Sequence, residues 1–270
     1  SEQRAASERS GGGSGAGGDS TVREMRLGGD GEVGGQAKHS AADRYSLTRD
    51  AGDDGVRIQG VRGEDGQLRY VVYLDGTIPD FLNPTRHRGP LENSSLLEFN
   101  TETYNYYLEE MRKHIQPPGA EVMIVGYSQG GILAQFLAVQ SGFKVTDVMT
   151  FGSPYAPFVD SGSDRNIVRI QDVDDPIPKI DPEVVATAWR SIFGDDKGAV
   201  DHILGRYSNP HDQTYTTDTS TEPTLLGVGT HTSKTTYIDG GNQYEAQAEK
   251  TDAGRMALES QSRFTGDCRS

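Results

Sequence analysis

The clearest candidate for a reactive residue in this chain lies in the segment from Glu121 to Gly131, EVMIVGYSQGG. Four apolar residues, Val122–Val125, lead into Gly126–Gly130, and an apolar pattern at helical spacing follows. A G-x-S-x-G segment between a buried strand and a helix is typical of a nucleophile elbow, whose tight turn holds the serine hydroxyl clear of the sheet. The helix that follows directs backbone N–H groups and its positive dipole end to the same place. The pattern predicts Ser128 as a nucleophile; a glycine-rich turn with a surface serine is the alternative.

A serine hydroxyl needs a base, an acid and oxyanion donors before it can act at neutral pH. In a parallel sheet these groups come from loops at the carboxyl ends of the strands. The expected strand Asn166–Val173 ends in a cluster of aspartates, and Asp175 stands immediately before a rigid Pro-Ile-Pro loop. We therefore expect Asp175 to be the acid, with Asp174 as second choice and Asp172 as third. A solvated acidic turn is the other interpretation.

Three histidines follow this acid along the chain, and each is a candidate base: His202, His211 and His231. His211 immediately precedes the expected strand Gln213–Ser220, which places it at the wrong edge of a parallel sheet. His231 follows the same strand, at the correct edge. We expect His231 to be the base, with His211 as second choice and His202 as third. The chain order is then serine, acid, histidine, one of the known orders of such triads.

The remaining parts of the site are backbone donors and an apolar pocket. One oxyanion donor is expected to be the backbone N–H of Gln129, and the other that of Thr77, in the loop after a β-rich segment. No histidine or second carboxylate group is spaced to complete a metal site at the aspartates, so we expect neither a metal nor a cofactor. Five apolar or aromatic residues are candidates for an acyl pocket, although they suit the core equally well: Ile78, Phe81, Leu82, Tyr155 and Phe158.

The elements around these residues alternate between strand and helix. An initial hairpin is expected from two β-rich segments joined by a turn at Gly63–Gly66. The chain thereafter predicts an α/β fold with a mainly parallel sheet and helices on both faces. Besides the elbow, the expected strands are Val56–Arg62, Leu68–Asp75, Val145–Phe151, Asn166–Val173 and Gln213–Ser220, and the expected helices are Ser94–Ile115, Val184–Phe193 and Tyr244–Gln261.

Composition divides the chain unevenly. Of its 34 glycines, 13 lie in residues 1–55, where Tyr45 is the only aromatic residue. Such a segment buries too little apolar surface to offset its ordering entropy, so residues 1–52 are predicted to be a flexible arm or linker with at most a short helix around Gly35–Tyr45. Residues 53–262 are predicted to form the folded domain, and residues 263–270 a polar tail.

The net charge and hydropathy of the chain argue against some classes of binding partner. The formal net charge of −14 and the pI near 4.8 argue against nucleic acid and against electrostatic docking to anionic membranes. No stretch approaches the roughly 18 apolar residues of a transmembrane helix, so no stable membrane insertion is expected. The N-terminal residues do not read as a signal peptide, and localisation stays open. Cys268 is the sole cysteine, which rules out a disulfide framework.

With these residues placed, the chain resembles serine hydrolases of the α/β-hydrolase superfamily. In particular it resembles actinobacterial α/β-hydrolase domains found in large secreted or toxin-like proteins. The resemblance runs from about Val56 to Tyr237 and is carried by VVYLDGT (Val71–Thr77), GYSQGG (Gly126–Gly131), VMTFGSP (Val148–Pro154) and DDPIP (Asp174–Pro178).

Parts of the pattern are similar to other branches of the superfamily. The GSP and DPIP segments are similar to lipase class 3, and GYSQG is similar to cutinases, which however carry disulfides around the acid. The family tends to show an H-x-x-x-x-Y-like segment at the base. Here His231 is followed by Tyr237 and His211 by Tyr215, so the match is weakest at the histidine.

The resemblance implies hydrolysis of a lipid, phospholipid or other carboxylic ester, and a place within a larger secreted or toxin-like protein. Two other functions stay open. An acyltransferase would use the same triad with an acceptor other than water. A catalytically inactive interaction module, carried by the glycine-rich arm, would use none of it.

Overall fold

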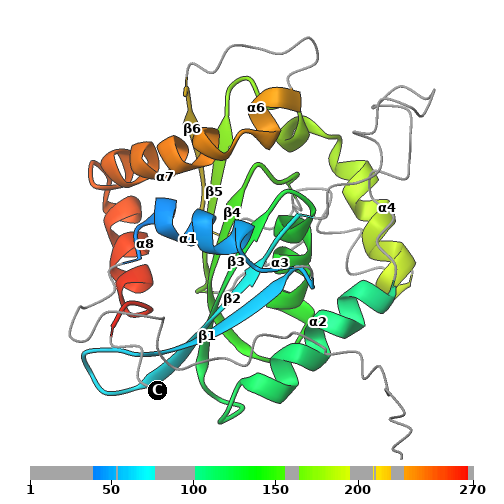
Figure 1. The fold of residues 1–270 in the computed structure, drawn as a ribbon, viewed down its shortest axis with the longest axis vertical. Coiled ribbons are helices and arrows are strands. Elements are labelled where there is room, and N and C mark those ends of the chain that lie inside the picture. Colours follow the sequence, from blue (N-terminus) through cyan, green and yellow to red (C-terminus); the bar gives the residue numbers. More distant parts are fainter. Residues whose placement is uncertain are drawn as a thin grey trace, which may run out of the picture.

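The computed structural model describes residues 39–52, 54–76, 101–155, 164–194, 209, 211–219 and 228–266. Within these residues the chain forms a six-stranded sheet whose spatial order follows the sequence (Figure 1). The first two strands are antiparallel, and every later pair is parallel. The strands are β1 (Val56–Arg62), β2 (Leu68–Leu74), β3 (Glu121–Tyr127), β4 (Lys144–Phe151), β5 (Asn166–Asp172) and β6 (Asp212–Thr217).

The hairpin between β1 and β2 forms where the sequence predicts it. The N–H of Gly63 donates to the carbonyl of Gln67 at 3.0 Å, and the N–H of Gly66 donates to the carbonyl of Gly63 at 2.9 Å. Gly66 has φ of +76°, a conformation that a residue with a Cβ adopts only at a cost. The predicted strands all form, with ends that differ by no more than three residues.

Helices cover both faces of the sheet. They are α1 (Ala41–Arg49), α2 (Thr101–His114), α3 (Gln129–Gln140), α4 (Pro182–Phe193), α6 (Val228–Thr232), α7 (Lys234–Ala248) and α8 (Asp252–Ser262), with a short 3₁₀ turn, η3, at Ile177–Lys179. From β2 to β6, each parallel strand lies on the same side of the strand before it. Because crossovers between parallel strands are right-handed, the connecting helices α2, α3 and α4 lie on one face of the sheet (Figure 1). The other face is covered by α1, α7 and α8, which precede β1 or follow β6. The predicted α/β class, with a mainly parallel sheet between helices, is confirmed.

Two apolar cores lie on the two faces because successive strand residues point to opposite sides. In β3, Ile124 packs with the cluster under α2 and α3, and Val125 packs with the cluster under α1 and α7. Both side chains are fully buried. The strand that ends at Ser128 therefore lies inside the molecule with packing on both faces, which is what holds its end in place.

The predicted flexible arm extended too far. Residues 41–49 form α1, which lies on the sheet with Tyr45 1% exposed and Ala41 1% exposed. Ser40 caps the helix through a reciprocal hydrogen-bonded pair with Asp43. The helix approaches α7 at a glycine, since a Cβ on Gly241 would lie 2.7 Å from the Ala42 nitrogen. Close backbone contact at Gly241 and the burial of Tyr45 against Tyr127, Phe151 and Tyr237 hold this segment on the sheet. Residues 1–38 lie outside the described structure.

The C-terminal region also differs from expectation. The single helix predicted over Tyr244–Gln261 is two helices, α7 and α8, and α7 begins ten residues earlier. The break falls where Thr251 caps α8 by accepting a hydrogen bond from the N–H of Gly254. The predicted polar tail is wrong at its start, because Phe264 is fully buried beneath α8.

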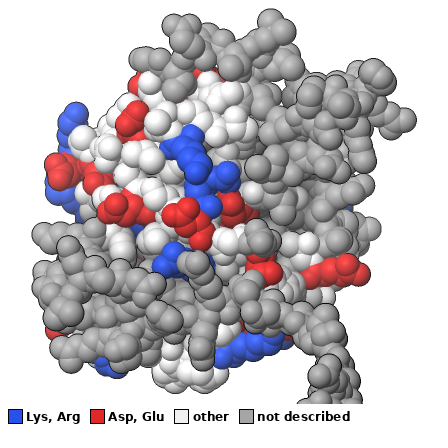
Figure 2. All heavy atoms as spheres, viewed as in Figure 1, with Lys and Arg blue, Asp and Glu red and all other residues white. Residues whose placement is uncertain are grey.

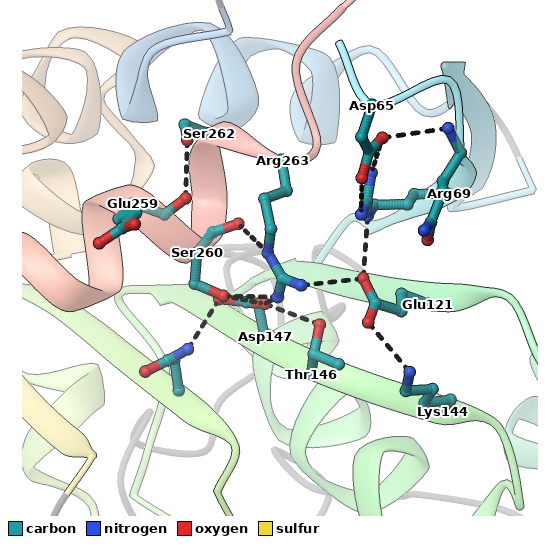
Figure 3. A network of polar contacts seen from close by, with 12 residues as sticks. Asp65, Arg69, Glu121, Lys144, Thr146, Asp147, Glu259, Ser260, Ser262 and Arg263 are labelled. Carbon is teal, nitrogen blue, oxygen red and sulfur yellow. Dashed lines mark hydrogen bonds and ion pairs between the residues drawn. The ribbon is translucent and has the colours of Figure 1, made fainter. Parts of the chain in front are cut away.

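Charged and polar side chains join α8 to the amino ends of the strands (Figure 3). Glu121 accepts hydrogen bonds from Arg69 at 2.9 Å, from Lys144 at 3.0 Å and from Arg263 at 3.0 Å. Asp147, 1% exposed, accepts from Ser260 at 2.9 Å. This cluster connects the hairpin, the sheet and α8 at the sheet edge opposite the elbow.

The described surface on the α1 side carries acidic and basic groups interspersed, with no broad patch of one sign (Figure 2). In the part of the chain that the structure describes, no helix combines the length and apolar character needed to cross a bilayer.

Candidate active site

The turn after β3 holds Ser128 in an unusual backbone conformation. Ser128 has φ of 53° and ψ of −122°, and among the described residues it is the only non-glycine with positive φ. Such a conformation costs on the order of 1–3 kcal/mol and persists only where the surroundings enforce it. Here the N–H of Ser128 donates to the carbonyl of Phe151 at 2.9 Å, and the N–H of Gly131 donates to the carbonyl of Ser128 at 3.1 Å. The strain is thus fixed by β4 on one side and α3 on the other.

The glycines of the pentapeptide permit this turn. A Cβ on Gly126 would lie 2.5 Å from the carbonyl oxygen of Gly130, and a Cβ on Gly130 would lie 2.3 Å from the carbonyl oxygen of Leu74. Both distances are well below van der Waals contact, so neither position accepts a side chain without movement of the backbone. The backbone geometry is thus the tight strand-to-helix turn that the sequence pattern predicts.

His231 lies next to this serine. Its Nε2 is 2.9 Å from Ser128 Oγ, and its Nδ1 is 2.7 Å from Asp175 Oδ2. His231 lies in α6, which follows β6 in the chain, and it is only 5% exposed. The structure thus brings together the three residues that the sequence predicts as nucleophile, base and acid, within hydrogen-bond distance of one another.

Asp175 is fully buried at the end of the loop after β5. Its Oδ1 accepts the N–H of Ile177 at 2.8 Å, at the start of the turn η3. Its Oδ2 receives the hydroxyl of Tyr237 as well as facing the histidine. The Pro-Ile-Pro segment therefore holds this carboxylate in one orientation, as its rigidity predicts.

The other two aspartates of the cluster lie elsewhere. Asp172 is buried and accepts the N–H and the hydroxyl of Thr219, at 3.1 and 2.8 Å, which ties the end of β5 to the end of β6. Asp174 is exposed, and its N–H donates to Asp172. Neither carboxylate has a recorded contact with His231.

The second-choice base is at the opposite end of the sheet. The carbonyl of His211 accepts the N–H of Ile167 at 3.0 Å, at the amino ends of β5 and β6. His211 therefore stands away from Ser128, which follows β3 at the carboxyl edge of the sheet. His202 lies outside the described residues.

The oxyanion donors are described in part. Gln129 is the first residue of α3, so its N–H has no acceptor within the helix and lies directly after Ser128. The loop after β2 also reaches the elbow, because a Cβ on Gly76 would lie 2.8 Å from the Cβ of Ser128. The N–H of Gly76 is already donated to Asp75 at 2.7 Å. Thr77, the predicted second donor, lies outside the described residues.

The predicted acyl-pocket residues are mostly outside the described structure as well. Ile78, Phe81, Leu82 and Phe158 belong to that group. Tyr155 is described: it is 37% exposed, and the guanidinium of Arg169 lies 4.3 Å from its ring centroid. No recorded contact joins Tyr155 to Ser128. Within the described ranges no group of three or more metal-ligating side chains comes together.

Two tyrosines that the sequence pattern did not indicate contact His231 and Asp175. Tyr127 precedes the nucleophile; its ring stacks on the imidazole of His231, with centroids 5.0 Å apart, and its hydroxyl donates to the carbonyl of that histidine. Tyr237, on α7, donates to Asp175. The signal for Tyr237 was its place shortly after the histidine, but no local pattern indicates which carboxylate its hydroxyl reaches.

Burial determines the charge state of these phenols. It raises the pKa of Tyr237 well above its ordinary value, and the negative charge of Asp175 adds to the effect. Burial likewise raises the pKa of Tyr127. Both hydroxyls therefore keep their protons at neutral pH and act as hydrogen-bond donors.

An ion pair connects α1 to the same region. Arg49 pairs with Asp75, and its guanidinium lies 4.5 Å from the ring centroid of Tyr127. Burial raises the pKa of Asp75, against the opposing influence of Arg49. The helix that was expected to be part of a flexible arm thus contacts both the loop after β2 and the residue before the nucleophile.

Comparison of the chain with protein-family models, with curated proteins and with solved structures found no match. A serine in a strained turn, a histidine at 2.9 Å and a buried carboxylate at 2.7 Å from that histidine form a proton-transfer chain suited to nucleophilic catalysis.

Proposed function

We propose that this chain is a serine hydrolase of the α/β-hydrolase type that cleaves carboxylic esters through an acyl-enzyme. The observation that carries the proposal is the unbroken contact series from Ser128 Oγ through the imidazole of His231 to the carboxylate of Asp175. A nucleophile, a base and an orienting acid within hydrogen-bond reach are the signature of an activated serine. The order of the three residues along the chain agrees with it.

In the proposed reaction, Ser128 Oγ attacks the ester carbonyl while His231 Nε2 takes its proton. The tetrahedral intermediate collapses, the ester C–O bond breaks, and the alcohol leaves with the proton that His231 returns. Water then attacks the acyl-enzyme with the histidine again as base, releasing the carboxylic acid. Asp175 fixes the ring orientation and offsets the positive charge that forms on it.

The negative charge on the intermediate needs backbone donors. The N–H of Gln129, at the start of α3, is in position to supply one, and the positive end of the helix dipole adds to it. We assign the second donor to Thr77, since the neighbouring Gly76 contacts the elbow and its own N–H is engaged by Asp75. No step in this scheme requires a metal or a cofactor.

The ester class follows from resemblance. Similarity to secreted and toxin-type hydrolase domains favours a lipid, phospholipid or other carboxylic ester as substrate. Acyl transfer would use the same three residues, and product analysis with added alcohols separates it from hydrolysis. An inactive interaction module has no need of a strained serine beside a buried histidine–carboxylate pair, and the geometry therefore favours an enzyme.

Turnover of short p-nitrophenyl esters tests the proposal. Ser128→Ala removes the nucleophile and is expected to lower kcat by on the order of 10⁴- to 10⁶-fold. Retention of full activity by this variant would refute the acyl-enzyme mechanism.

A further inference from the structure

One oxygen of the acid serves two partners. Asp175 Oδ2 faces His231 Nδ1 at 2.7 Å and also receives the hydroxyl of Tyr237. The other oxygen, Oδ1, accepts a backbone N–H from Ile177. Every described hydrogen-bond partner of this fully buried carboxylate is thus a donor. One of these donors is a phenol, which a serine–histidine–aspartate triad does not require.

The ring of Tyr237 is held in place on several sides. Its centroid lies 5.7 Å from that of Tyr45, 6.0 Å from that of Tyr127 and 6.1 Å from that of Phe151. Gly152, with φ of +55°, makes room for the hydroxyl, because a Cβ there would lie 2.6 Å from the phenol oxygen and 2.9 Å from Asp175 Oδ2. The side chain is fully buried. The phenol therefore has one orientation, and it is directed at the carboxylate.

We propose that Tyr237 is a positioning residue, which fixes the Asp175 carboxylate and moderates the charge that this carboxylate presents to His231. The inference rests on the proposed hydrolase function and deepens it. Tyr237 touches neither the substrate nor Ser128; it acts through Asp175.

Two measurable effects follow from this geometry. Without the phenol, the carboxylate loses one of its three donors and is less firmly oriented, so kcat falls. Its Oδ2 then carries more negative charge toward the imidazole, which favours the imidazolium form, and the protonated, inactive enzyme persists to higher pH. The acid limb of the kcat/KM profile therefore moves upward in pH. A purely structural tyrosine would produce neither change.

The other charged and titratable groups around Asp175 and His231 are either neutral or paired. In the portion of the chain that is described, the groups facing the site from the packed elements are Tyr45 and Arg49 of α1, Asp75 after β2, Tyr127 of β3 and Asp172 of β5. Burial raises the pKa of Tyr45 to about 12, so it is neutral, like Tyr127. Arg49 and Asp75 form an ion pair with each other, and Asp172 is engaged by Thr219. The Arg49–Asp75 and Asp172–Thr219 contacts do not involve the hydroxyl of Tyr237.

The test compares Tyr237→Phe with Tyr244→Phe. Both tyrosines are fully buried on α7, and Tyr244 donates to Gln261 at 3.2 Å, away from the triad. Tyr237→Phe is expected to lower kcat by about ten- to a hundredfold with little change in KM, the range expected for loss of one hydrogen bond to a charged group, and to move the acid limb to higher pH. Tyr244→Phe is expected to change neither. Equal kcat values and superimposable pH profiles for wild type and Tyr237→Phe would overturn the inference.

A readout that needs no turnover separates this inference from the proposed function. The Nδ1 proton of His231 is observed by NMR in the Ser128→Ala background, with and without Tyr237→Phe. Loss of the phenol makes Oδ2 a stronger acceptor and is expected to move this proton further downfield. If the wild type shows no esterase activity while the proton moves, the hydrolase proposal fails and the positioning contact stands. If esterase activity is present while the chemical shift of the Nδ1 proton does not change, the positioning role of Tyr237 is refuted and the hydrolase proposal stands.

Discussion

The aromatic ring of Tyr127 lies nearly parallel to the imidazole of His231, with a 20° angle between the planes. Its hydroxyl donates to the carbonyl of the same histidine. Tyr127, which directly precedes Ser128, therefore holds His231 beside it, even though 103 residues separate Ser128 from His231 in the sequence. The turn at Tyr127 and Ser128 thus contacts His231 through two successive residues.

Loss of the Tyr127 ring should slow turnover. A stacked aromatic pair contributes ~0.5–1.5 kcal/mol beyond its buried area, which corresponds to a fall of up to about tenfold in kcat if the stack orients the base. Tyr127→Leu is expected to show this fall in ester hydrolysis. Tyr127→Phe keeps the ring and loses only the hydroxyl contact, so it is the matched control for the stack and is expected to retain more activity than Tyr127→Leu. Equal kcat values for the two variants would mean that the stack has no part in orienting His231.

Substitution of the two candidate histidines is expected to have opposite effects on kcat. His231→Ala removes the base and is expected to lower kcat by on the order of 10⁴- to 10⁶-fold. His211→Ala changes a residue at the far edge of the sheet and should leave kcat within about twofold of wild type, since distant sites act independently. Steady-state kinetics on one short ester decide between them, and the reverse outcome would assign the base to His211.

The glycines of the elbow should tolerate no side chain. Gly130→Ala places a Cβ 2.3 Å from the carbonyl oxygen of Leu74 and is expected to lower the free energy of unfolding by about 1–3 kcal/mol through overpacking. Gly119→Ala is the control, because a Cβ there meets nothing within 4 Å. Urea denaturation of both variants provides the measurement. A Gly130→Ala protein as stable as wild type would contradict the described turn.

Stability should depend on pH through Glu121. Although burial raises its pKa, hydrogen bonds from Arg69 and Lys144 outweigh that effect and lower it. A lowered folded-state pKa means that this contribution is fully present above the unfolded value of ~4.3 and is lost as the pH falls through the folded value. Glu121→Gln is therefore expected to cost on the order of 1 kcal/mol of unfolding free energy at pH 7, and progressively less below pH ~4.

The control for this prediction is Glu64→Gln, which makes the same chemical change in the exposed hairpin turn. Denaturation curves at several pH values compare the two variants. A cost for Glu121→Gln that stays constant between pH 7 and pH 3 would show that the ion pairs are not its source.

Most of the sheet was predictable because its strands are short β-rich segments bounded by glycine, proline or aspartate. The elbow was predictable because only glycine fits at Gly126 and Gly130. The place of His231 followed from one rule of topology, that parallel strands present their carboxyl ends at a single edge. Asp175 followed from the rigid loop that comes after it.

The sequence was uninformative where tertiary contacts outweigh local pattern. Helix α1 has little amphipathic periodicity and packs through small residues against Gly241, so composition alone suggested disorder. The separation of α7 from α8 depends on the side-chain cap from Thr251. The role of Tyr237 could not be read locally, because its partner Asp175 is 62 residues away in the chain.

Labelling with a serine-reactive fluorophosphonate, followed by peptide mass spectrometry, tests the central claim most directly. The reagent needs a nucleophilic serine and a nearby base, but no knowledge of the natural ester. We predict one adduct, on Ser128, with labelling strongly slowed in His231→Ala and unchanged in His211→Ala. A folded protein that gains no adduct, or gains it on a different serine, would contradict the account.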